Sequence, residues 1–271
     1  MRLFGFQNTL ARDFQAGRTR RDVPPGGVRA GRSWTEETQD GHAVHRFGPA
    51  GREAEGPTYL HLHGGGFITG LLNPQTVVMT RLADLGGFPI VLPDYPLPPD
   101  RDAEGMLTFC DEVLSAELAK GPVVLGGDSA GGTLAILLAA RRAAAGRPLP
   151  QSLVLWSPLC DLDVNAAGYD GWDGVIEPDG VRLGAARFAG AAGDAVNPAR
   201  VPLEGLPPIT VFAGERDPLY PDIRAWIARA EAAGVHLTTH TEPLGHYWMF
   251  LPQPEAERTR RQIAEAVTSS P

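Results

Sequence analysis

The sequence predicts a protein of the α/β class, with a mainly parallel sheet and helices on both of its faces. Two observations lead to this fold. From residue 58 onward, short apolar runs alternate with longer stretches whose apolar residues recur at helical spacing. Turns rich in glycine and proline separate these stretches, and the chain contains 33 glycines and 25 prolines. With 271 residues, of which 43% are hydrophobic, we expect a single domain spanning residues 1–271.

The strands are expected where short apolar runs end at glycine, proline or polar turn residues. The first signal is weak and covers residues 42–47, inside an otherwise polar N-terminal region. Stronger signals follow, and the last strand precedes a short turn near the C-terminus. The expected strands cover residues 58–63, 89–92, 123–125, 152–156, 209–213 and 235–241.

The helices are expected between these strands. In residues 103–119, for example, apolar side chains recur three and four positions apart, which places them on one helical face. The expected helices cover residues 76–85, 103–119, 133–145, 222–233 and 255–267. Residues 158–208 interrupt the alternation with acidic, Gly/Ala-rich and proline-rich sequence.

Composition excludes several classes of function. A net charge of −8 argues against a nucleic-acid groove and against binding to anionic membranes. No apolar run approaches the roughly 18 residues of a membrane span, and residues 1–14 lack the apolar core of a signal peptide. Cys110 and Cys160 have no metal-ligand spacing, so we expect no metal site and two reduced thiols, with a disulfide between them as the alternative. These features predict a soluble, cytoplasmic protein.

A glycine-rich turn between an expected strand and an expected helix carries the strongest functional signal. The pentapeptide GDSAG at 127–131 fits the pattern G-x-S-x-G, with Ser129 at its centre. Between a strand and a helix, this pattern marks a nucleophile elbow, in which small neighbours let the two elements pass closely. The alternative is an ordinary glycine-rich connection. The strand–turn–helix context favours Ser129 as a nucleophile.

A serine nucleophile needs a base, and histidine is the usual one. Enzymes with this type of elbow carry their triad in the order serine, acid, histidine, which leaves His236, His240 and His246. His236 and His240 lie inside an expected strand on one face. His246 follows that strand after a short turn, where a loop can place it over the site. We therefore predict His246 as the base, with a loop histidine of purely structural role as the alternative.

The acid that orients the base should follow the preceding strand. Asp217 lies three residues beyond the glycine that ends the expected strand 209–213, and a proline follows it. Glu215 and Asp222 are the rival carboxylates. We predict Asp217 as the orienting acid, and the alternative is an N-cap of the next helix, because aspartate caps helices well.

Backbone N–H groups should stabilise the negative oxygen that forms during acyl transfer. The residue after the nucleophile, Ala130, supplies one such group, and the loop after an earlier strand supplies others. The sequence HGGGF at 63–67 provides this loop, because its three glycines leave the backbone open to an oxyanion. HGGG alone would also suit a phosphate cradle or a plain turn. Together with GDSAG and the later Asp and His, it is a specific signal.

These motifs resemble the hormone-sensitive-lipase-like branch of serine esterases, within the α/β-hydrolase superfamily. HGGGF at 63–67, GDSAGG at 127–132, Asp217 and His246 carry the resemblance. Weaker similarities extend it over residues 58–268, with DYPLPPD at 94–100 similar to the family's D-Y-R-L-A-P-E and SPLCDL at 157–162 similar to its S-P-x-x-D-L. The resemblance implies an α/β-hydrolase fold and a triad of Ser129, Asp217 and His246. It also implies oxyanion N–H groups from Gly65, Gly66 and Ala130, and no cofactor.

The resemblance further implies a cap, which the family builds from the N-terminus and an insertion before the acid-bearing strand. In this chain these segments are residues 1 to about 45 and 158–200, and the N-terminal one is shorter than the family's, so we expect a reduced cap and a more open site. Pro96 and Asp100 depart from the family's Arg and Glu, which brace the loops under the site. Candidate substrate-binding residues near the site are aromatic or apolar, with core packing as the alternative: Phe67, Ile68, Tyr95 and Tyr247.

The predicted function is hydrolysis of small to medium, moderately apolar carboxylic esters through an acyl-enzyme. An amidase or formamidase and a carbohydrate deacetylase would use the same fold and triad, and a non-catalytic ligand-binding relative is the alternative from another class. Such relatives usually lose a triad member, whereas His246 is present. The family often forms dimers, so a homodimer is compatible with the sequence.

Overall fold

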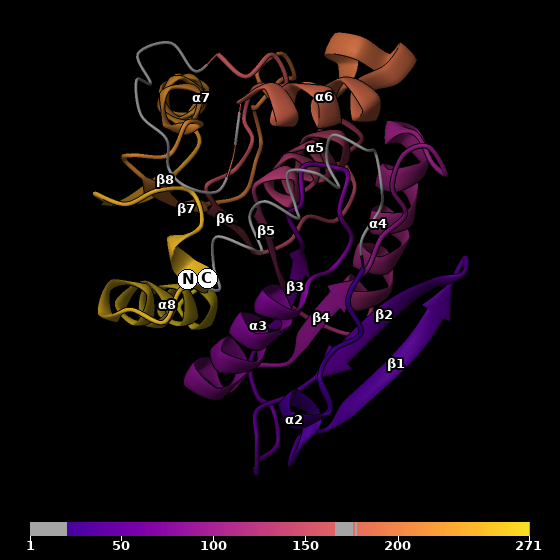
Figure 1. Ribbon diagram of the computed structural model, residues 1–271. Helices are drawn as coiled ribbons and strands as arrows, with labels where there is room; N and C mark the ends of the chain where they lie inside the picture. The colour runs from indigo at the N-terminus through magenta and orange to yellow at the C-terminus, as the bar shows by residue number, and fades with distance from the viewer. Residues whose placement is uncertain (1–20, 166–175, 177, 271) are drawn as a thin grey trace.

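A computed structural model of the protein describes residues 21–165, 176 and 178–270, and one eight-stranded sheet lies at its centre (Figure 1). The strands are β1 (Trp34–Gln39), β2 (His42–Phe47), β3 (Thr58–Leu62), β4 (Ile90–Pro93), β5 (Val123–Asp128), β6 (Ser152–Trp156), β7 (Ile209–Gly214) and β8 (Leu237–Glu242). The α-helices are α2 (Gly26–Arg29), α3 (Asn73–Gly86), α4 (Ala103–Leu118), α5 (Ala130–Ala144), α6 (Pro178–Ala189), α7 (Tyr220–Ala232) and α8 (Pro254–Thr268). Two 3₁₀ helices are η1 (Gly190–Val196) and η2 (Trp248–Phe250).

The order of strands across the sheet is β1-β2-β4-β3-β5-β6-β7-β8. The pairs from β4 to β8 are all parallel, whereas β1 pairs with β2 and β2 pairs with β4 in antiparallel fashion. This is the mainly parallel sheet that the alternating sequence predicts. Parallel strands present their carboxyl ends at one edge, where sites of open α/β sheets lie. Ser129, Asp217 and His246 follow β5, β7 and β8 at this edge.

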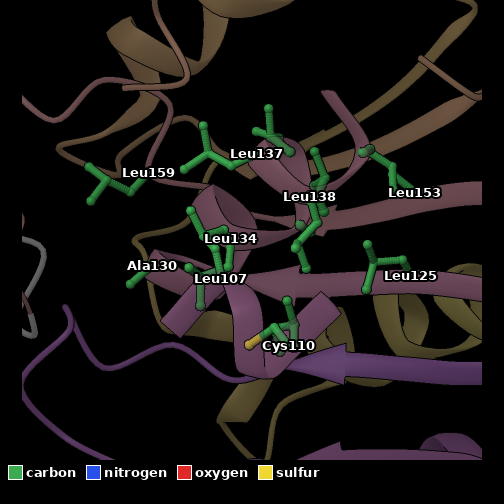
Figure 2. Close-up of a cluster of buried hydrophobic side chains, with 14 of the residues drawn as sticks. Leu107, Cys110, Leu125, Ala130, Leu134, Leu137, Leu138, Leu153 and Leu159 are labelled. Carbon is green, nitrogen blue, oxygen red and sulfur yellow. The ribbon is translucent and has the colours of Figure 1, made fainter. Parts of the chain in front are cut away.

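Helices cover both faces of the sheet, as predicted (Figure 1). Alternate residues of the strands point to opposite faces. In β5, Val123 and Leu125 pack in the cluster with α4, α5 and α7, whereas Val124 packs with α3 and α8 on the other face. Figure 2 shows part of the first cluster, in which leucines of α5 lie among side chains of α4, β5 and β6. Cys110 lies in this cluster, and both Cys110 and Cys160 are buried free thiols.

Strand β1 and helix α6 are among the elements that were not expected from the sequence. Strand β1 is a polar strand at the edge of the sheet. It is joined to β2 by the turn Asp40–Gly41, in which both residues have positive φ (49° and 80°). Such two-residue Asp-Gly turns are a strong hairpin signal. Helix α6 lies in residues 158–208, which interrupt the alternation of strands and helices. Its buried residues, Val181, Gly184, Ala185 and Phe188, have helical spacing, but two of them are a glycine and an alanine, so the apolar pattern in the sequence is weak.

The N-terminal boundary of the predicted cap needs correction. Residues 34–47 form β1 and β2 and therefore belong to the sheet, because β2 pairs with β4. Residues 1–20 of the predicted cap lie outside the described residues, as do 166–175 and 177 of the second cap segment. The described part of the second segment contains α6 and η1.

Candidate active site

Ser129 lies between the end of β5 and the start of α5. Its backbone has φ 52° and ψ −118°, a region that residues other than glycine rarely occupy. Its N–H donates to the carbonyl of Trp156 (2.9 Å), and its own carbonyl accepts from the N–H of Leu159 (2.9 Å). These bonds to β6 and the following loop hold the strained turn, while the serine remains partly exposed. The structure thus has the strand–turn–helix geometry that the GDSAG pattern predicts.

The first turn of α5 packs directly on the end of β3. A Cβ atom at Gly131 would lie 1.9 Å from the carbonyl oxygen of Leu62 and 2.6 Å from that of His63, so only glycine permits this approach. Ala130 is the first residue of the helix, where N–H groups have no partner within the helix. The packing therefore brings these donors beside the loop that follows β3.

We call residues 63–72 the oxyanion loop, after the role predicted for Gly65 and Gly66. Gly65, Gly66 and Phe67 all have positive φ (125°, 60° and 59°), and the carbonyl of Gly65 accepts the N–H groups of Ile68 and Thr69 at 3.0 Å each. These bonds close a tight turn. The loop is joined to the nucleophile turn by the N–H of Gly64, which donates to the carboxylate of Asp128 (2.8 Å).

Asp217 and His246 meet in the loops after the neighbouring strands β7 and β8. His246 Nδ1 lies 2.7 Å from Asp217 Oδ2, and the residues are 8% and 1% exposed. The second carboxylate oxygen, Asp217 Oδ1, accepts the N–H of Leu219 (2.9 Å). The N–H of Arg216 donates to the carbonyl of Leu244 (3.0 Å), which ties the two loops together. The carboxylate is therefore fixed on both oxygens and holds one ring nitrogen of the histidine.

The rival residues take other places. His240 stacks on Phe212, with ring centroids 4.8 Å apart, and His236 is exposed. Glu215 is exposed and accepts a hydrogen bond from Thr241 (3.1 Å). Asp222 is buried in the first turn of α7. Among the predicted acids and bases, the structure brings together Asp217 and His246.

Asp128 is a buried carboxylate that the sequence reasoning missed. Besides the N–H of Gly64, its carboxylate accepts hydrogen bonds from His61 Nε2 (2.9 Å) and from Gln75 Nε2 (3.3 Å). The hydroxyl of Tyr59 lies 3.0 Å from the other ring nitrogen of His61, Nδ1. Burial alone would raise the pKa of Asp128, but its hydrogen bond with His61 holds that pKa below the usual value. Burial lowers the pKa of His61, so a neutral histidine faces an ionised aspartate. The network anchors the oxyanion loop to the residue before Ser129.

The comparisons with known proteins agree with this fold. The family model of the α/β-hydrolase fold matches residues 59–250. An esterase of Acinetobacter venetianus is 30% identical over 78% of this chain and 74% of its own length. An acetyl-hydrolase of Streptomyces hygroscopicus is 28% identical over 90% of this chain and 82% of its own. A solved esterase of the bacterial hormone-sensitive lipase family superposes with a TM-score of 0.81 at 24% identity, covering 100% of this chain and 98% of that one.

This chain belongs to the α/β-hydrolase family. The predicted resemblance to its hormone-sensitive-lipase-like members is confirmed, and so is the predicted fold class. Within residues 21–165, 176 and 178–270, no cluster of three or more His, Cys, Asp or Glu residues could hold a metal ion. No helix in the same residues is both long and apolar enough to cross a membrane.

Three of the predicted substrate-binding residues of this α/β-hydrolase are packed away from solvent. Phe67 stacks on Phe188 of α6 (4.1 Å between centroids), and Ile68 is 2% exposed. Tyr95 stacks on His63 at 4.1 Å, and its hydroxyl donates to the carbonyl of that residue. These side chains support the oxyanion loop in this structure. Tyr247, next to His246, is partly exposed.

The structure also locates the two departures from the family pattern. Pro96 is buried after β4, and Asp100 is exposed. An exposed Asp100 does not brace the loops under the site.

Asp222 is expected to make stability depend on pH. Burial, followed by the negative charge of Asp161, raises its pKa to about 6 from 3.8. The folded state therefore binds this proton more tightly than the unfolded state, and stability is lost as pH rises through about 6. We expect Asp222→Asn to gain about 1–2 kcal/mol over wild type at pH 7.5, and less at pH 5, in urea denaturation.

The matched control is Asp163→Asn. Asp163 lies in the same region, but its side chain is 66% exposed and pairs with Arg200 (2.7 Å) at the surface. Its removal should change the free energy of unfolding by less than about 0.5 kcal/mol at either pH. A variant Asp222→Asn that is less stable than wild type at pH 7.5 would contradict this account of the buried carboxylate.

Proposed function

We propose that the protein is a serine carboxylic-ester hydrolase in which Ser129, His246 and Asp217 form the catalytic triad. The observation that carries the proposal is the 2.7 Å contact between His246 Nδ1 and the buried carboxylate of Asp217. A carboxylate that holds Nδ1–H fixes the tautomer in which Nε2 can accept a proton from a serine hydroxyl. The similarity to an esterase and an acetyl-hydrolase supports the same reaction class.

In the first half of the reaction, Ser129 Oγ attacks the ester carbonyl carbon while His246 Nε2 takes its proton. The carbonyl oxygen becomes an oxyanion, and collapse of the tetrahedral intermediate breaks the bond to the alcohol oxygen. His246 returns its proton to that oxygen, so an alcohol leaves and an acyl-enzyme remains. The ionised Asp217 stabilises the imidazolium that forms in each proton transfer.

In the second half, water takes the place of the alcohol. His246 removes a proton from the water, the resulting hydroxide attacks the acyl carbon, and a second oxyanion forms. Its collapse breaks the bond to Ser129 Oγ, which receives the proton back from His246. The products are a carboxylic acid and the free enzyme, and the cycle requires no cofactor.

The proposed oxyanion donors are the backbone N–H groups of Gly65, Gly66 and Ala130. The contact of Gly131 with the end of β3 supports this proposal, because it packs the start of α5 against the oxyanion loop. The bond from Gly64 to Asp128 holds the same two segments together. Preorganised donors of this type each contribute about 10²–10³ in kcat.

The proposed substrates are small to medium, moderately apolar esters, with residues 158–200 acting as a reduced cap. Helix α6 in this segment packs closely on the oxyanion loop, through the Phe67–Phe188 stack and through Gly184, whose Cα faces the carbonyl of Gly66. This close packing leaves little room for a long acyl chain over the loop. The acetyl-hydrolase relative is consistent with a short acyl group.

A series of p-nitrophenyl esters from acetyl to dodecanoyl, with the matched p-nitroanilide of the best acyl group, tests the proposal. We expect kcat/KM to be highest for short acyl chains and at least about 10²-fold lower for the anilide. Turnover of the anilide at the rate of the ester would instead indicate an amidase. A folded protein inert to the whole series would contradict the esterase proposal and favour a ligand-binding relative.

A further inference from the structure

We propose that Arg21, acting through Asp94, positions the oxyanion loop for catalysis. This inference rests on the proposed esterase function and adds a residue that none of the sequence motifs includes. Arg21 lies just before α2 in the N-terminal segment, 42 positions before His63 (63 − 21). Asp94 directly follows β4. The interaction therefore joins the N-terminal segment to the loop under the site.

One carboxylate oxygen of Asp94 lies against the N-terminal segment and against both ends of the oxyanion loop. Asp94 Oδ1 forms an ion pair with Arg21, accepts the N–H of Leu71 (3.0 Å) and lies 3.4 Å from His63 Nε2. Leu71 and His63 are near the two ends of the oxyanion loop. A single carboxylate oxygen thus binds one end of this loop and lies close to the other.

The guanidinium of Arg21 also binds the chain that carries Asp94. It donates to the backbone carbonyls of Asp94 (3.1 Å) and Tyr95 (3.0 Å). Tyr95 in turn donates its hydroxyl to the carbonyl of His63 and stacks on its ring. Arg21 therefore holds both the carboxylate and the aromatic ring that support the start of the oxyanion loop.

The packing around Arg21 leaves little freedom. A Cβ atom at Gly70 would lie 2.4 Å from Arg21 Cγ and 2.8 Å from Asp94 Oδ1, so the loop backbone lies directly against this ion pair. The next residue, Asp22, donates its N–H to the carbonyl of Leu71 (2.8 Å) and accepts the N–H of Asn73 at the start of α3 (3.1 Å). Residues 21 and 22 thus hold the C-terminal end of the loop from two sides.

The two ends of the loop are anchored in different ways. The N–H of Gly64 is held by Asp128, which Arg21 does not contact. The opposite end depends on Asp94 and the N-terminal segment. Without the guanidinium, the Asp94 carboxylate loses its charged donor and keeps the N–H of Leu71, so the carboxylate can rotate and Leu71 can shift. Displacements of about 1 Å in an active site can lower rates by about 10²-fold.

The test compares Arg21→Ala with Arg32→Ala in the full chain. Arg32 also joins the N-terminal segment to α3, through two 2.6 Å contacts with Asp84, but at the end of the helix that is remote from the loop. We expect Arg21→Ala to lower kcat for p-nitrophenyl acetate by about 10- to 100-fold with KM changed by less than about threefold. Arg32→Ala should retain kcat within about twofold while it lowers stability.

Two further readouts separate positioning from general destabilisation. Arg21 is partly exposed, at 28% of its side chain, so guanidinium chloride at millimolar concentration should enter the vacated position and raise kcat of Arg21→Ala. Arg21→Lys should recover kcat only in part, because an ammonium pairs with Asp94 but lacks the planar fork. Neither guanidinium nor lysine would restore a kcat that is low because the protein is partly unfolded.

A kcat of Arg21→Ala within about twofold of wild type would overturn the proposal, and so would a loss that neither guanidinium nor Arg21→Lys relieves. Both results require that wild type hydrolyses the ester and that Ser129 is its nucleophile. If wild type does not hydrolyse the ester, the proposed function is wrong, and this is known before any Arg21 variant is assayed. A result on the Arg21 variants therefore tests the Arg21 proposal alone.

Discussion

Replacing Ser129 with alanine is expected to lower kcat/KM for p-nitrophenyl acetate by at least about 10³-fold, because no nucleophile remains to form the acyl-enzyme. The fold should survive. Alanine carries the same Cβ as serine at this positive φ, and the bonds of the turn to Trp156 and Leu159 are made by backbone atoms. The measurement is steady-state kinetics, with urea denaturation to confirm that the variant is folded.

Ser157→Ala is the matched control for this substitution. Ser157 follows the neighbouring strand β6, has φ 39°, is 2% exposed, and its hydroxyl has no partner among the described residues. The two serines therefore share a position at a strand end and a strained backbone with positive φ, but only Ser129 lies in the nucleophile turn. We expect Ser157→Ala to retain activity within about threefold. Equal losses in both variants would indicate that Ser129 acts through structure and is not the nucleophile.

Asp217→Asn is expected to lower kcat by about 10³–10⁴-fold while the protein keeps its fold. The reason lies in the two bonds of this carboxylate. Asp217 Oδ1 accepts the N–H of Leu219, so an asparagine must place its carbonyl oxygen there and its amide NH₂ toward His246. An NH₂ facing Nδ1 favours the tautomer with the proton on Nε2, which can no longer accept the proton of Ser129. Kinetics at pH 7.5 measure this loss.

The control is Asp222→Asn, assayed for activity under the same conditions. It removes another buried carboxylate five residues along the chain (222 − 217), in the first turn of α7, and leaves the Asp217–His246 pair in place, so kcat should stay within about twofold. If Asp217→Asn retained kcat within about tenfold, the orienting role of Asp217 would be wrong, and the next carboxylate to test would be Glu215.

Much of the fold and of the candidate site could be predicted because the signals are local. The strands β3 to β7 show apolar runs ended by turns, and the parallel sheet follows from their alternation with helices. The nucleophile turn is recognisable because its glycines are needed wherever a strand and a helix pass this closely, as at Gly131. Chain order pointed to Asp217 and His246, which the structure brings within 2.7 Å.

The contacts that were missed link residues far apart in the sequence. Arg21 binds the carbonyl of Asp94 across 73 positions, and His61 meets Asp128 across 67. No periodicity or spacing encodes such pairs, because they form only when β3, β4 and β5 lie side by side. The choice between substrate binding and core packing for Phe67 and Tyr95 depends on long-range contacts of the same kind. Sequence placed them near the site, but only the packing of α6 and His63 shows which way they face.

The most direct test of the central claim is covalent labelling with an organophosphate, followed by intact-mass measurement and peptide mapping. The account predicts one adduct per folded chain, located on Ser129, with its rate greatly reduced in Asp217→Asn and no adduct in Ser129→Ala. Labelling depends on an activated serine beside an oxyanion site, so it does not require knowledge of the natural ester. An unlabelled wild type, or an adduct that persists in Ser129→Ala, would contradict the assignment of Ser129 as the nucleophile.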